Sequence, residues 1–384
     1  MRLGKNLGWW FISVVCFLLS ACLSQVSNTA TVAVRETGGE TESVSSVIWV
    51  KTLVRGLSQP WGMDFLPDGN ILVTEKPGGL KRITTNNYAM QDIKGLPETA
   101  DAGQGGLLDI LVHPNFASNG LIYLSYTVEE KQLYSTRVMR AKLENNQLVD
   151  KQVLFTAQPF YQERRHFGSR LLLDEGYLYI TVGDRGHRDL AQSLQTHNGK
   201  VIRLRENGTV PEDNPFVARV GAQPEIWTYG HRNPQGIARN PLTGAIWVSE
   251  HGPQGGDEIN ELHRAANYGW PLVTYGEEYG GGKIGIGAQL AGTVQPLTYY
   301  VPSIGTGGMD FYVGDKYSFW QNSLLVSGLH SSQISRVALK GDGIEQKTRL
   351  QMDMRVRDLQ VGPDGFIYAL ADGSRLVRLE TEKP

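Results

Sequence analysis

One strand–turn–strand pattern recurs six times along this chain and limits the folds open to it. Each copy has an apolar, strand-like run, a turn containing Gly, Pro, Asp or Asn, and a second run rich in β-branched and aromatic residues. Helical periodicity is almost absent. The copies occupy residues 62–75, 105–127, 169–184, 235–252, 310–330 and 356–372.

This recurrence, with one antiparallel sheet per copy, predicts an all-β, six-bladed β-propeller. Residues 47–384 give about 56 residues per blade, so some connections are expected to be long. The glycine-rich segment 274–292 is the main candidate for such a loop. A two-sheet sandwich would explain the strands but not the sixfold return of the turn. Residues 47–54 have no nearby partner and are expected to close the ring beside the last blade.

The N-terminus does not follow the repeat. Arg2 and Lys5 precede an apolar run that ends in small residues, the layout of an export signal. The tetrapeptide LSAC resembles a bacterial lipoprotein cleavage box, which would leave Cys22 lipidated as the first mature residue. An ordinary signal or an uncleaved anchor is the alternative. We expect residues 1–21 to be a lipoprotein-type signal peptide and the protein to be exported, in the periplasm or the cell envelope.

Residues 22–46 are polar, small and without period, and predict a flexible tether. Residues 47–384 would then form one propeller domain. Leu23 carries no retention charge, which favours the outer membrane. A formal net charge of −2 gives no electrostatic reason to expect nucleic acid as a partner. Homodimerisation is left open, because no stretch marks a dimer surface.

The segment ERRHFGSR places His166 among three arginines. Nearby cations favour the neutral imidazole, which is the form that accepts a proton. Asp184 ends the second strand of the same unit, and an antiparallel hairpin would bring the two residues together. Two interpretations stay open at this point. His166 is a base polarised by Asp184, or the pair is a surface histidine and a turn aspartate.

Three further loops carry residues that turn formation alone does not need. Gln104 lies in a glycine-rich entry to a strand, where its amide can meet a ligand. Arg232 and Asn233 crowd a proline turn, which predicts a rigid guanidinium platform. In the third loop, Asp257 and Glu258 offer carboxylate oxygens of the kind that calcium takes, although no EF-hand spacing is present and a solvent-facing acidic pair is the alternative.

Together these segments resemble the soluble quinoprotein glucose dehydrogenase family, including the aldose sugar dehydrogenases that use pyrroloquinoline quinone (PQQ). The resemblance spans about residues 60 to 365. It implies a six-bladed propeller with the quinone at the channel mouth, in agreement with the repeat count. The matching stretches are PWGMDFLPDG, GQGGLLDI, HFGSRL, VGDRG, YGHRNPQG, SEHGP, GDEIN, NYGWP and RVRDLQVGPDG.

The resemblance also implies catalytic roles. His166 would take the proton from the anomeric hydroxyl of an aldose while the hydride moves to the quinone, so that a lactone forms. Asp184 would orient His166, and Arg232 would stabilise negative charge on the reduced quinone. An external acceptor would then remove the electrons. The implied cofactor contacts are Gln104, Arg232, Asn233, Gly252, His330, Arg355 and Arg357.

Calcium is implied at two places. Gly252 and Pro253 would offer backbone carbonyls to a Ca²⁺ ion that polarises the quinone oxygen. Asp257, Glu258 and Tyr268 match a region that holds structural calcium in relatives.

The chain departs from the family pattern at three positions. Arg165 replaces the usual Asp or Asn before the histidine, Ser169 replaces a glycine, and His330 replaces the cofactor-binding lysine. Two other functions therefore stay open. One is a calcium-dependent, lactonase-like hydrolase, and the other is a non-catalytic propeller that binds a carbohydrate or a partner after losing the cofactor.

Overall fold

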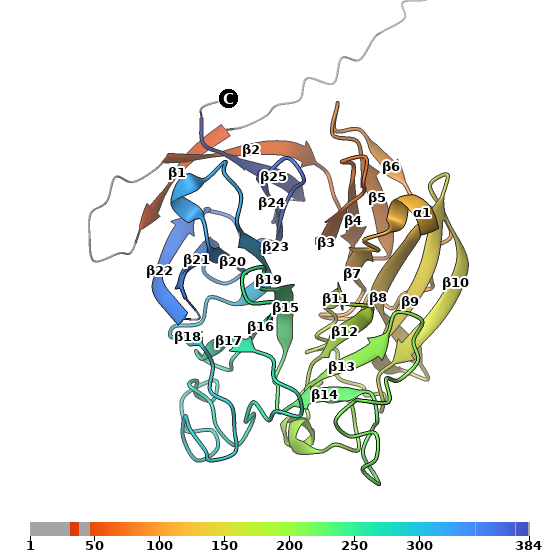
Figure 1. The fold of residues 1–384 in the computed structure, drawn as a ribbon, viewed down its shortest axis with the longest axis vertical. Helices are drawn as coiled ribbons and strands as arrows, with labels where there is room; N and C mark the ends of the chain where they lie inside the picture. The colour runs from red at the N-terminus through yellow and green to blue at the C-terminus, as the bar shows by residue number, and fades with distance from the viewer. Residues whose placement is uncertain (1–30, 38–46, 342, 373, 383–384) are drawn as a thin grey trace, which may run out of the picture.

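The computed structural model describes residues 31–37, 47–341, 343–372 and 374–382. These residues are nearly all β, and six small antiparallel sheets surround a common axis as the blades of a propeller (Figure 1). The predicted all-β, six-bladed β-propeller is confirmed. None of the helices in the described part has the length and apolar character needed to cross a membrane.

Each blade takes its strands in chain order, starting at the axis, except that β2 completes the last blade. The strands of blades 1 to 3 are β3 (Pro60–Phe65), β4 (Ile71–Glu75), β5 (Gly79–Ile83) and β6 (Met90–Asp92); β7 (Leu107–Val112), β8 (Leu121–Glu130), β9 (Leu133–Glu144) and β10 (Gln147–Thr156); β11 (Leu171–Asp174), β12 (Tyr177–Val182), β13 (Lys200–Arg205) and β14 (Ile226–Tyr229). Those of blades 4 to 6 are β15 (Pro234–Arg239), β16 (Ile246–Glu250), β17 (Asp257–Glu261) and β18 (Thr298–Tyr300); β19 (Thr306–Tyr312), β20 (Ser323–Gly328), β21 (Gln333–Lys340) and β22 (Gly343–Gln351); β23 (Val356–Val361), β24 (Ile367–Ala371), β25 (Arg375–Glu380) and β2 (Val47–Arg55).

Helices are few and short. The described residues contain α1 (Phe116–Asn119) and the 3₁₀ turns η1 (Arg188–Gln192) and η2 (Ser318–Trp320). The connection between β17 and β18 is long and irregular and forms the teal loops at the lower edge of Figure 1. It contains the glycine-rich segment 274–292, which is a loop as predicted.

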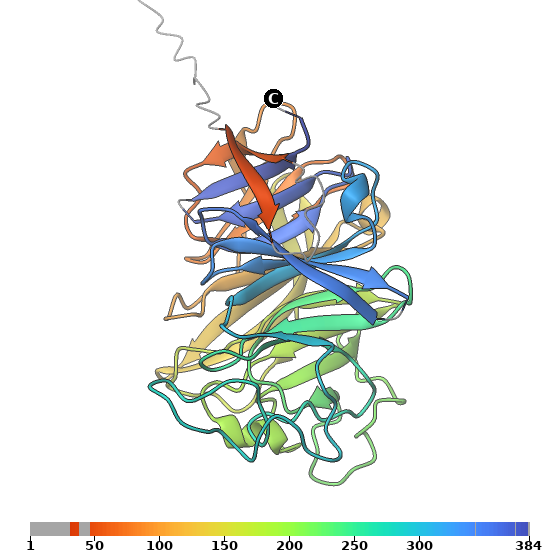
Figure 2. The same cartoon turned by 90° about the vertical axis from the view of Figure 1, so that its left-hand side faces the viewer.

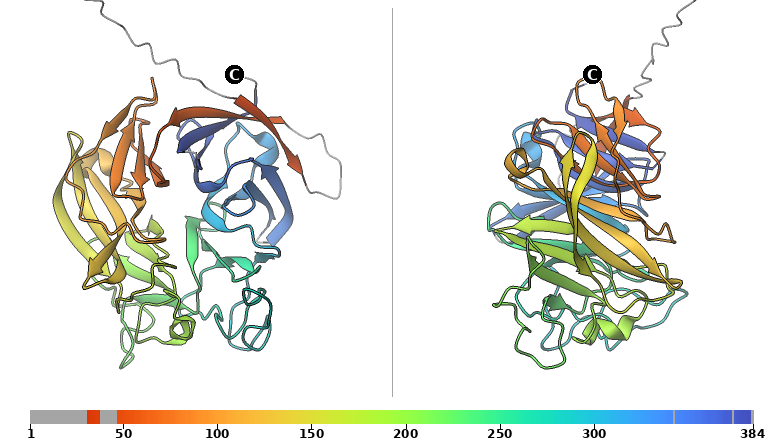
Figure 3. Two further views of the ribbon diagram at one scale, coloured as in Figure 1. Left: turned by 180° about the vertical axis from the view of Figure 1, so that it is seen from behind. Right: turned by 90° about the vertical axis from the view of Figure 1, so that its right-hand side faces the viewer.

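The ring closes between the two ends of the chain. β2 pairs with β25, with Trp49 opposite Glu380 and Val50 opposite Leu379. Figure 3 shows β2 lying along the outside of the last blade. The prediction that residues 47–54 close the ring is confirmed.

One part of the predicted tether is a strand, so that expectation is wrong for residues 31–37. β1 (Thr31–Thr37) pairs with β2 and, through its last two residues, with β22. Figure 2 shows β1, in orange-red, beside the blue strands of the last two blades. The physical reason is that the outer edges of β2 and β22 offer unpaired backbone groups, and TVAV is a β-branched run that can use them. The predicted signal peptide, Cys22 and residues 38–46 lie outside the described residues.

Apolar side chains fill the spaces between neighbouring blades. Leu72 and Ile110 belong to one cluster that joins blades 1 and 2, and Trp247 and Leu324 belong to another that joins blades 4 and 5. These side chains are at most 2% exposed. Burial of this apolar surface holds the blades together and leaves the axis to polar groups.

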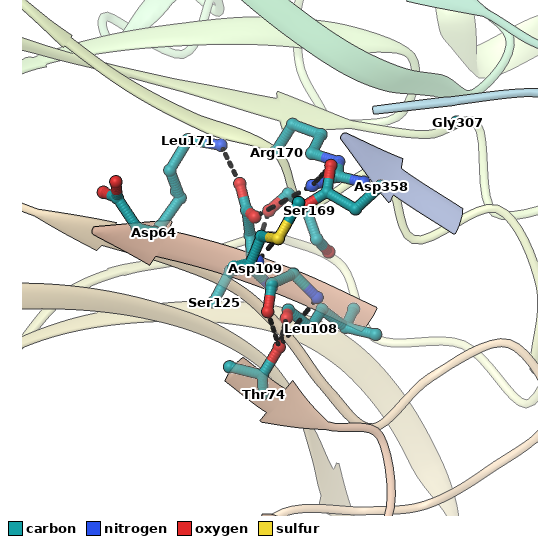
Figure 4. A network of polar contacts seen from close by, with 12 residues as sticks. Asp64, Thr74, Leu108, Asp109, Ser125, Ser169, Arg170, Leu171, Gly307 and Asp358 are labelled. Carbon is teal, nitrogen blue, oxygen red and sulfur yellow. Dashed lines mark hydrogen bonds and ion pairs between the residues drawn. The ribbon is translucent and has the colours of Figure 1, made fainter. Parts of the chain in front are cut away.

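A buried ion network crosses the axis (Figure 4). Nη1 of Arg170, just before β11, lies 3.0 Å from Oδ1 of Asp109 and 2.9 Å from Oδ1 of Asp358. Its Nε donates to the carbonyl of Gln235 at 2.7 Å. In blade 5, a Cβ on Gly308 would come within 1.8 Å of the Asp358 carboxylate, so only glycine fits there. One guanidinium thus connects blades 2, 3, 4 and 6.

Inner-strand aspartates also join consecutive blades. Each carboxylate accepts a hydrogen bond from a backbone N–H of the following blade, and burial raises the pKa of Asp64 to about 7 and that of Asp310 to about 6. This polar frame fixes where the loops at the axis begin. The pairs are Asp64 with Val112, Asp109 with Leu171, Asp310 with Val361 and Asp358 with Met63.

Candidate active site

A cavity of about 1030 Å³ is lined by residues from all six blades. Most of them precede an innermost strand or follow a second strand, so the loops of the repeated unit converge on one space. The cavity is the default candidate for a binding site in a propeller. Among the residues that line it are Gln104, Phe167, Asn233, Gly252, His330, Arg355 and Arg357.

His166 and Asp184 are in contact beside the lining residues of this cavity, although neither of them lines it. Nδ1 of His166 lies 2.7 Å from Oδ1 of Asp184. His166 precedes β11 and Asp184 follows β12, so the hairpin brings together the two residues that the sequence analysis paired. Phe167 and Gly168 line the cavity, and His166 lies directly before them. No hydrogen bond from the described residues reaches Nε2 of His166.

The loop that carries His166 is held in an unusual backbone conformation. His166 has φ = 54° and Ser169 has φ = 85°, values that favour glycine. The N–H of His166 donates to Oε1 of Gln104 at 2.7 Å. Arg185 donates to the carbonyl of Arg165 at 2.6 Å and lies over the ring of Phe167. The loop is therefore clamped from both sides, and the imidazole is pre-positioned.

Burial lowers the pKa of His166 below its ordinary 6.5. The hydrogen bond to Asp184 acts in the opposite direction, while the positive charges of Arg232 and Arg165 lower the pKa further. Burial alone would raise the pKa of Asp184, but the hydrogen bond from His166 and the backbone N–H of Gly186 bring it below the usual value. At neutral pH the pair is therefore a neutral imidazole beside a carboxylate.

Arg232 is buried close to the dyad. Its N–H donates to Oε2 of Glu250 at 2.8 Å, and Nη1 donates to the carbonyl of His251 at 3.2 Å. Its Nε is buried without a hydrogen-bond partner, and no carboxylate of the described residues forms an ion pair with it. Asn233, the next residue, lines the large cavity and accepts the N–H of Gly168. A buried cation with spare donors therefore lies beside the cavity wall.

Arg357 is a second cation at the cavity; it is partly buried, and no carboxylate of the described residues forms an ion pair with it. Its Nη1 donates to Oε1 of Gln235 at 3.4 Å, and its guanidinium lies 5.9 Å from the centre of the Trp61 ring. Burial, followed by the charges of Arg170 and Arg355, lowers its pKa to about 10. Arg355 also lines the cavity but is half exposed and pairs with Asp372 at 3.3 Å. The cavity wall thus presents uncompensated positive charge, which fits an anionic ligand.

Comparison with known proteins decides which kind of propeller this is. The sequence model of the glucose/sorbosone dehydrogenase family matches residues 57–378. This chain belongs to that family. The resemblance drawn from the motifs is confirmed.

Several relatives of this family member are named as sugar dehydrogenases. Aldose sugar dehydrogenase YliI of Escherichia coli is 39% identical over 347 residues, which cover 86% of this chain and 94% of that protein. The apo-form crystal structure of soluble aldose sugar dehydrogenase from E. coli matches with a TM-score of 0.85 at 38% identity, covering 87% and 100% of the two chains. The PQQ-bound aldose sugar dehydrogenase of Streptomyces coelicolor matches with a TM-score of 0.72 at 25% identity, covering 87% and 98%.

The two residues whose carbonyls were expected to hold calcium are in the cavity wall. Gly252 and Pro253 both line it, and within the described residues no hydrogen bond reaches their carbonyl oxygens. The N–H of Gly252 donates to Oδ1 of Asp257 at 2.9 Å, which fixes the loop. This arrangement leaves both oxygens available to a cation.

The other predicted metal ligands are less free. Both oxygens of Asp257 accept hydrogen bonds, Oδ2 from Ser303 at 2.6 Å. The Tyr268 hydroxyl donates to the carbonyl of Glu261 at 2.6 Å. Burial and the neighbouring Glu250 raise the pKa of Glu258 to about 8. Glu258 also lines a small cavity of about 10 Å³. The described residues contain no cluster of three or more His, Cys, Asp or Glu side chains suited to a metal.

Several residues of the site were not singled out from the sequence. Trp270 donates to Asp184, Arg185 clamps the His166 loop, and Lys76 and Trp61 line the cavity. Trp270 belongs to the matched stretch NYGWP, so the motif was visible but the partner of its side chain was not. Lys76 ion-pairs with Asp101.

Proposed function

We propose that this chain is a PQQ-dependent dehydrogenase that oxidises aldose sugars at the anomeric carbon to lactones. The observation that carries the proposal is the His166–Asp184 pair, which lies next to a cavity lined by Arg357 and adjoined by the buried Arg232, two cations without an ion pair among the described residues. The family and the PQQ-bound neighbour support the same reaction class.

The residues present fit the cofactor. PQQ is a flat molecule with three carboxylates. Arg357 lines the cavity without an ion pair among the described residues, and the buried Nε of Arg232 has no hydrogen-bond partner there, so both have donors available for such an anion. Arg357 and Arg355 would hold carboxylates, and Gln104 and Asn233 would contact the ring or the sugar from the wall. His330, at the position where the family resemblance leads us to expect a cofactor-binding lysine, lines the same cavity.

His166 does the proton chemistry. Its Nδ1 is engaged by Asp184, so Nε2 is the atom that accepts the proton of the anomeric hydroxyl. Asp184 then stabilises the imidazolium, and Arg232 places a fixed positive charge near the reacting atoms. When bound, PQQ supplies the two-electron acceptor for the hydride that leaves the anomeric carbon. The sugar loses one proton and one hydride, and the lactone carbonyl forms.

We propose calcium at the Gly252 and Pro253 carbonyls, where it would add positive charge beside the cofactor. Glu258 is the candidate for a second site because its buried carboxylate has a single donor, the amide of Asn260. Asp257 and the Tyr268 hydroxyl are left out, since their oxygens are engaged within the protein.

The proposed setting is the cell envelope. Residues 1–22 support lipidation at Cys22, and the electrons would pass to an external acceptor. Labelling with a radioactive fatty acid, compared between wild type and Cys22→Ser, tests the anchor. Equal labelling of the two proteins would contradict it.

The decisive experiment reconstitutes full-length protein with PQQ and calcium and follows dye reduction over a panel of sugars. Reduction that is abolished by His166→Ala supports the proposal. The control is His263→Ala, a half-exposed histidine whose ring contacts only Glu261. Lactone hydrolysis without quinone would support the hydrolase instead, and absence of both activities would support a binding propeller.

A further inference from the structure

We propose that Trp270 is a positioning residue of the base dyad, whose indole N–H fixes the Asp184 carboxylate in the orientation that serves His166. The inference deepens the proposed function, because it rests on His166 being the base. It concerns a side chain that does not line the large cavity.

The Asp184 carboxylate is held at both oxygens. Oδ1 lies 2.7 Å from Nδ1 of His166 and accepts the N–H of Gly186 at 2.7 Å. Oδ2 accepts Nε1 of Trp270 at 2.8 Å. The side chain of Asp184 is only 2% exposed, so no bulk water replaces a lost donor. Rotation of the carboxylate away from His166 would break the indole bond, and a buried acceptor without a partner is costly.

Trp270 is itself rigidly placed. Its N–H donates to the carbonyl of Gly230 at 2.9 Å, and its own carbonyl accepts Nε2 of Gln192 at 2.8 Å. The ring packs with Ala191 and Ile284 in a small apolar cluster. The indole N–H is therefore delivered from a backbone fixed by blade 3, independently of the His166 loop.

The same ring connects the dyad to the neighbouring cation. The guanidinium of Arg232 lies 5.4 Å from the centre of the Trp270 ring. One side chain thus contacts the acid of the dyad with its edge and the arginine with its face. Through these two contacts, Trp270 can hold Asp184, and with it His166, at a fixed position relative to Arg232.

Loss of the indole donor has a defined electrostatic consequence. The donor withdraws charge from the carboxylate, so its removal makes the field of Asp184 at His166 more negative. The other charged groups facing His166, Arg232 and Arg165, stay in place. The pKa of His166 should therefore rise, whereas a structural role that only fills space predicts no change.

The test follows the His166 titration by NMR in full-length, cofactor-free protein, with the signal assigned by His166→Asn. Trp270→Phe should raise the His166 pKa by about 0.5 to 1 unit, the size expected for one hydrogen bond to a charged partner. The matched control is Trp247→Phe, which removes an indole donor to Glu261 in blade 4. A His166 pKa that is the same in folded Trp270→Phe and wild type would overturn the proposal.

If Trp270→Phe does not fold, a second variant tests the same proposal. Benzothienylalanine at position 270 keeps the shape of the indole and replaces the N–H by sulfur, so an upward shift again supports the role and no shift overturns it. With active enzyme, the acid limb of the rate–pH profile should move to higher pH by the same amount, and kcat should fall about tenfold. The NMR arm needs no activity, so failure of the proposed function does not obscure the result.

Discussion

Nδ1 of His166 lies 2.7 Å from Oδ1 of Asp184, and this contact decides which imidazole nitrogen is available to accept a proton. The carboxylate accepts a hydrogen bond from the Nδ1–H group, so Nε2 is the nitrogen with the free lone pair. His166 precedes β11 and Asp184 follows β12, so both residues lie at the open end of this antiparallel hairpin and act as one pair.

Replacement of that carboxylate should change both the rate and its pH dependence. The pKa of His166 lies below 6.5, so wild-type activity should decline only below that pH. Asp184 raises the pKa of His166, hence Asp184→Asn should move the acid limb to still lower pH. It should also lower kcat by roughly a hundredfold or more through loss of the orienting acceptor. The rate–pH profile measures both effects, and a limb shifted to higher pH would contradict this assignment.

Arg357 should lower the stability of the cofactor-free protein and increase its affinity for PQQ. Its pKa is lowered to about 10, so the fold disfavours the charged form and loses stability at neutral pH. Arg357→Gln should raise the Tm of cofactor-free protein by about 2 to 6 °C. It should weaken PQQ binding by about 10- to 100-fold.

The control for the predicted gain in stability of Arg357→Gln is Arg355→Gln, because Arg355 is half exposed and paired with Asp372. Its Tm should change little. Thermal unfolding and a fluorescence titration with PQQ give the two readouts. A lower Tm for cofactor-free Arg357→Gln would show that this guanidinium stabilises the fold.

His330→Lys should tighten quinone binding. His330 lines the cavity with Arg355 and Arg357, and a lysine ammonium is charged throughout the neutral range whereas an imidazole is not. We expect Kd to fall about tenfold at pH 8, the value of one charge-assisted hydrogen bond. The same Kd in both proteins would mean that His330 does not face the cofactor.

Ser169 should tolerate glycine better than alanine. Its φ of 85° costs on the order of 1 kcal/mol for a residue with a Cβ, while its hydroxyl donates to the carbonyl of Phe167 at 3.1 Å. Glycine loses the hydrogen bond but relieves the strain; alanine only loses the bond. Ser169→Gly should therefore melt about 2 to 4 °C above Ser169→Ala. Equal melting temperatures would argue against strain at this position.

The fold was predictable because its signal is local and repeated. Each strand–turn–strand unit can be recognised within about twenty residues, and six copies leave few architectures. β1 was missed although residues 31–35 pair with the neighbouring β2, because it lies in a mostly polar segment; only its last two residues pair with a distant strand, with Thr37 opposite Arg349. A polar, unpatterned segment gives no local sign that two strand edges are available to it.

The part of the site that lies within one repeat unit was predictable, whereas the contacts between blades were not. His166 and Asp184 lie in one unit, so hairpin geometry pairs them. Trp270 reaches Asp184 from another blade, and nothing in NYGWP indicates where its indole points. Arg357 carries no sequence mark of being unpaired, since that property depends on which carboxylates fold near it.

The last blade takes β23, β24 and β25 from the end of the chain and β2 from its beginning. During synthesis, the edge of β2 that pairs with β25 therefore has no partner until β25 has left the ribosome. Loop closure over such a span is slow. The ring, and with it the cavity at its axis, can therefore close only after β25 has been synthesised.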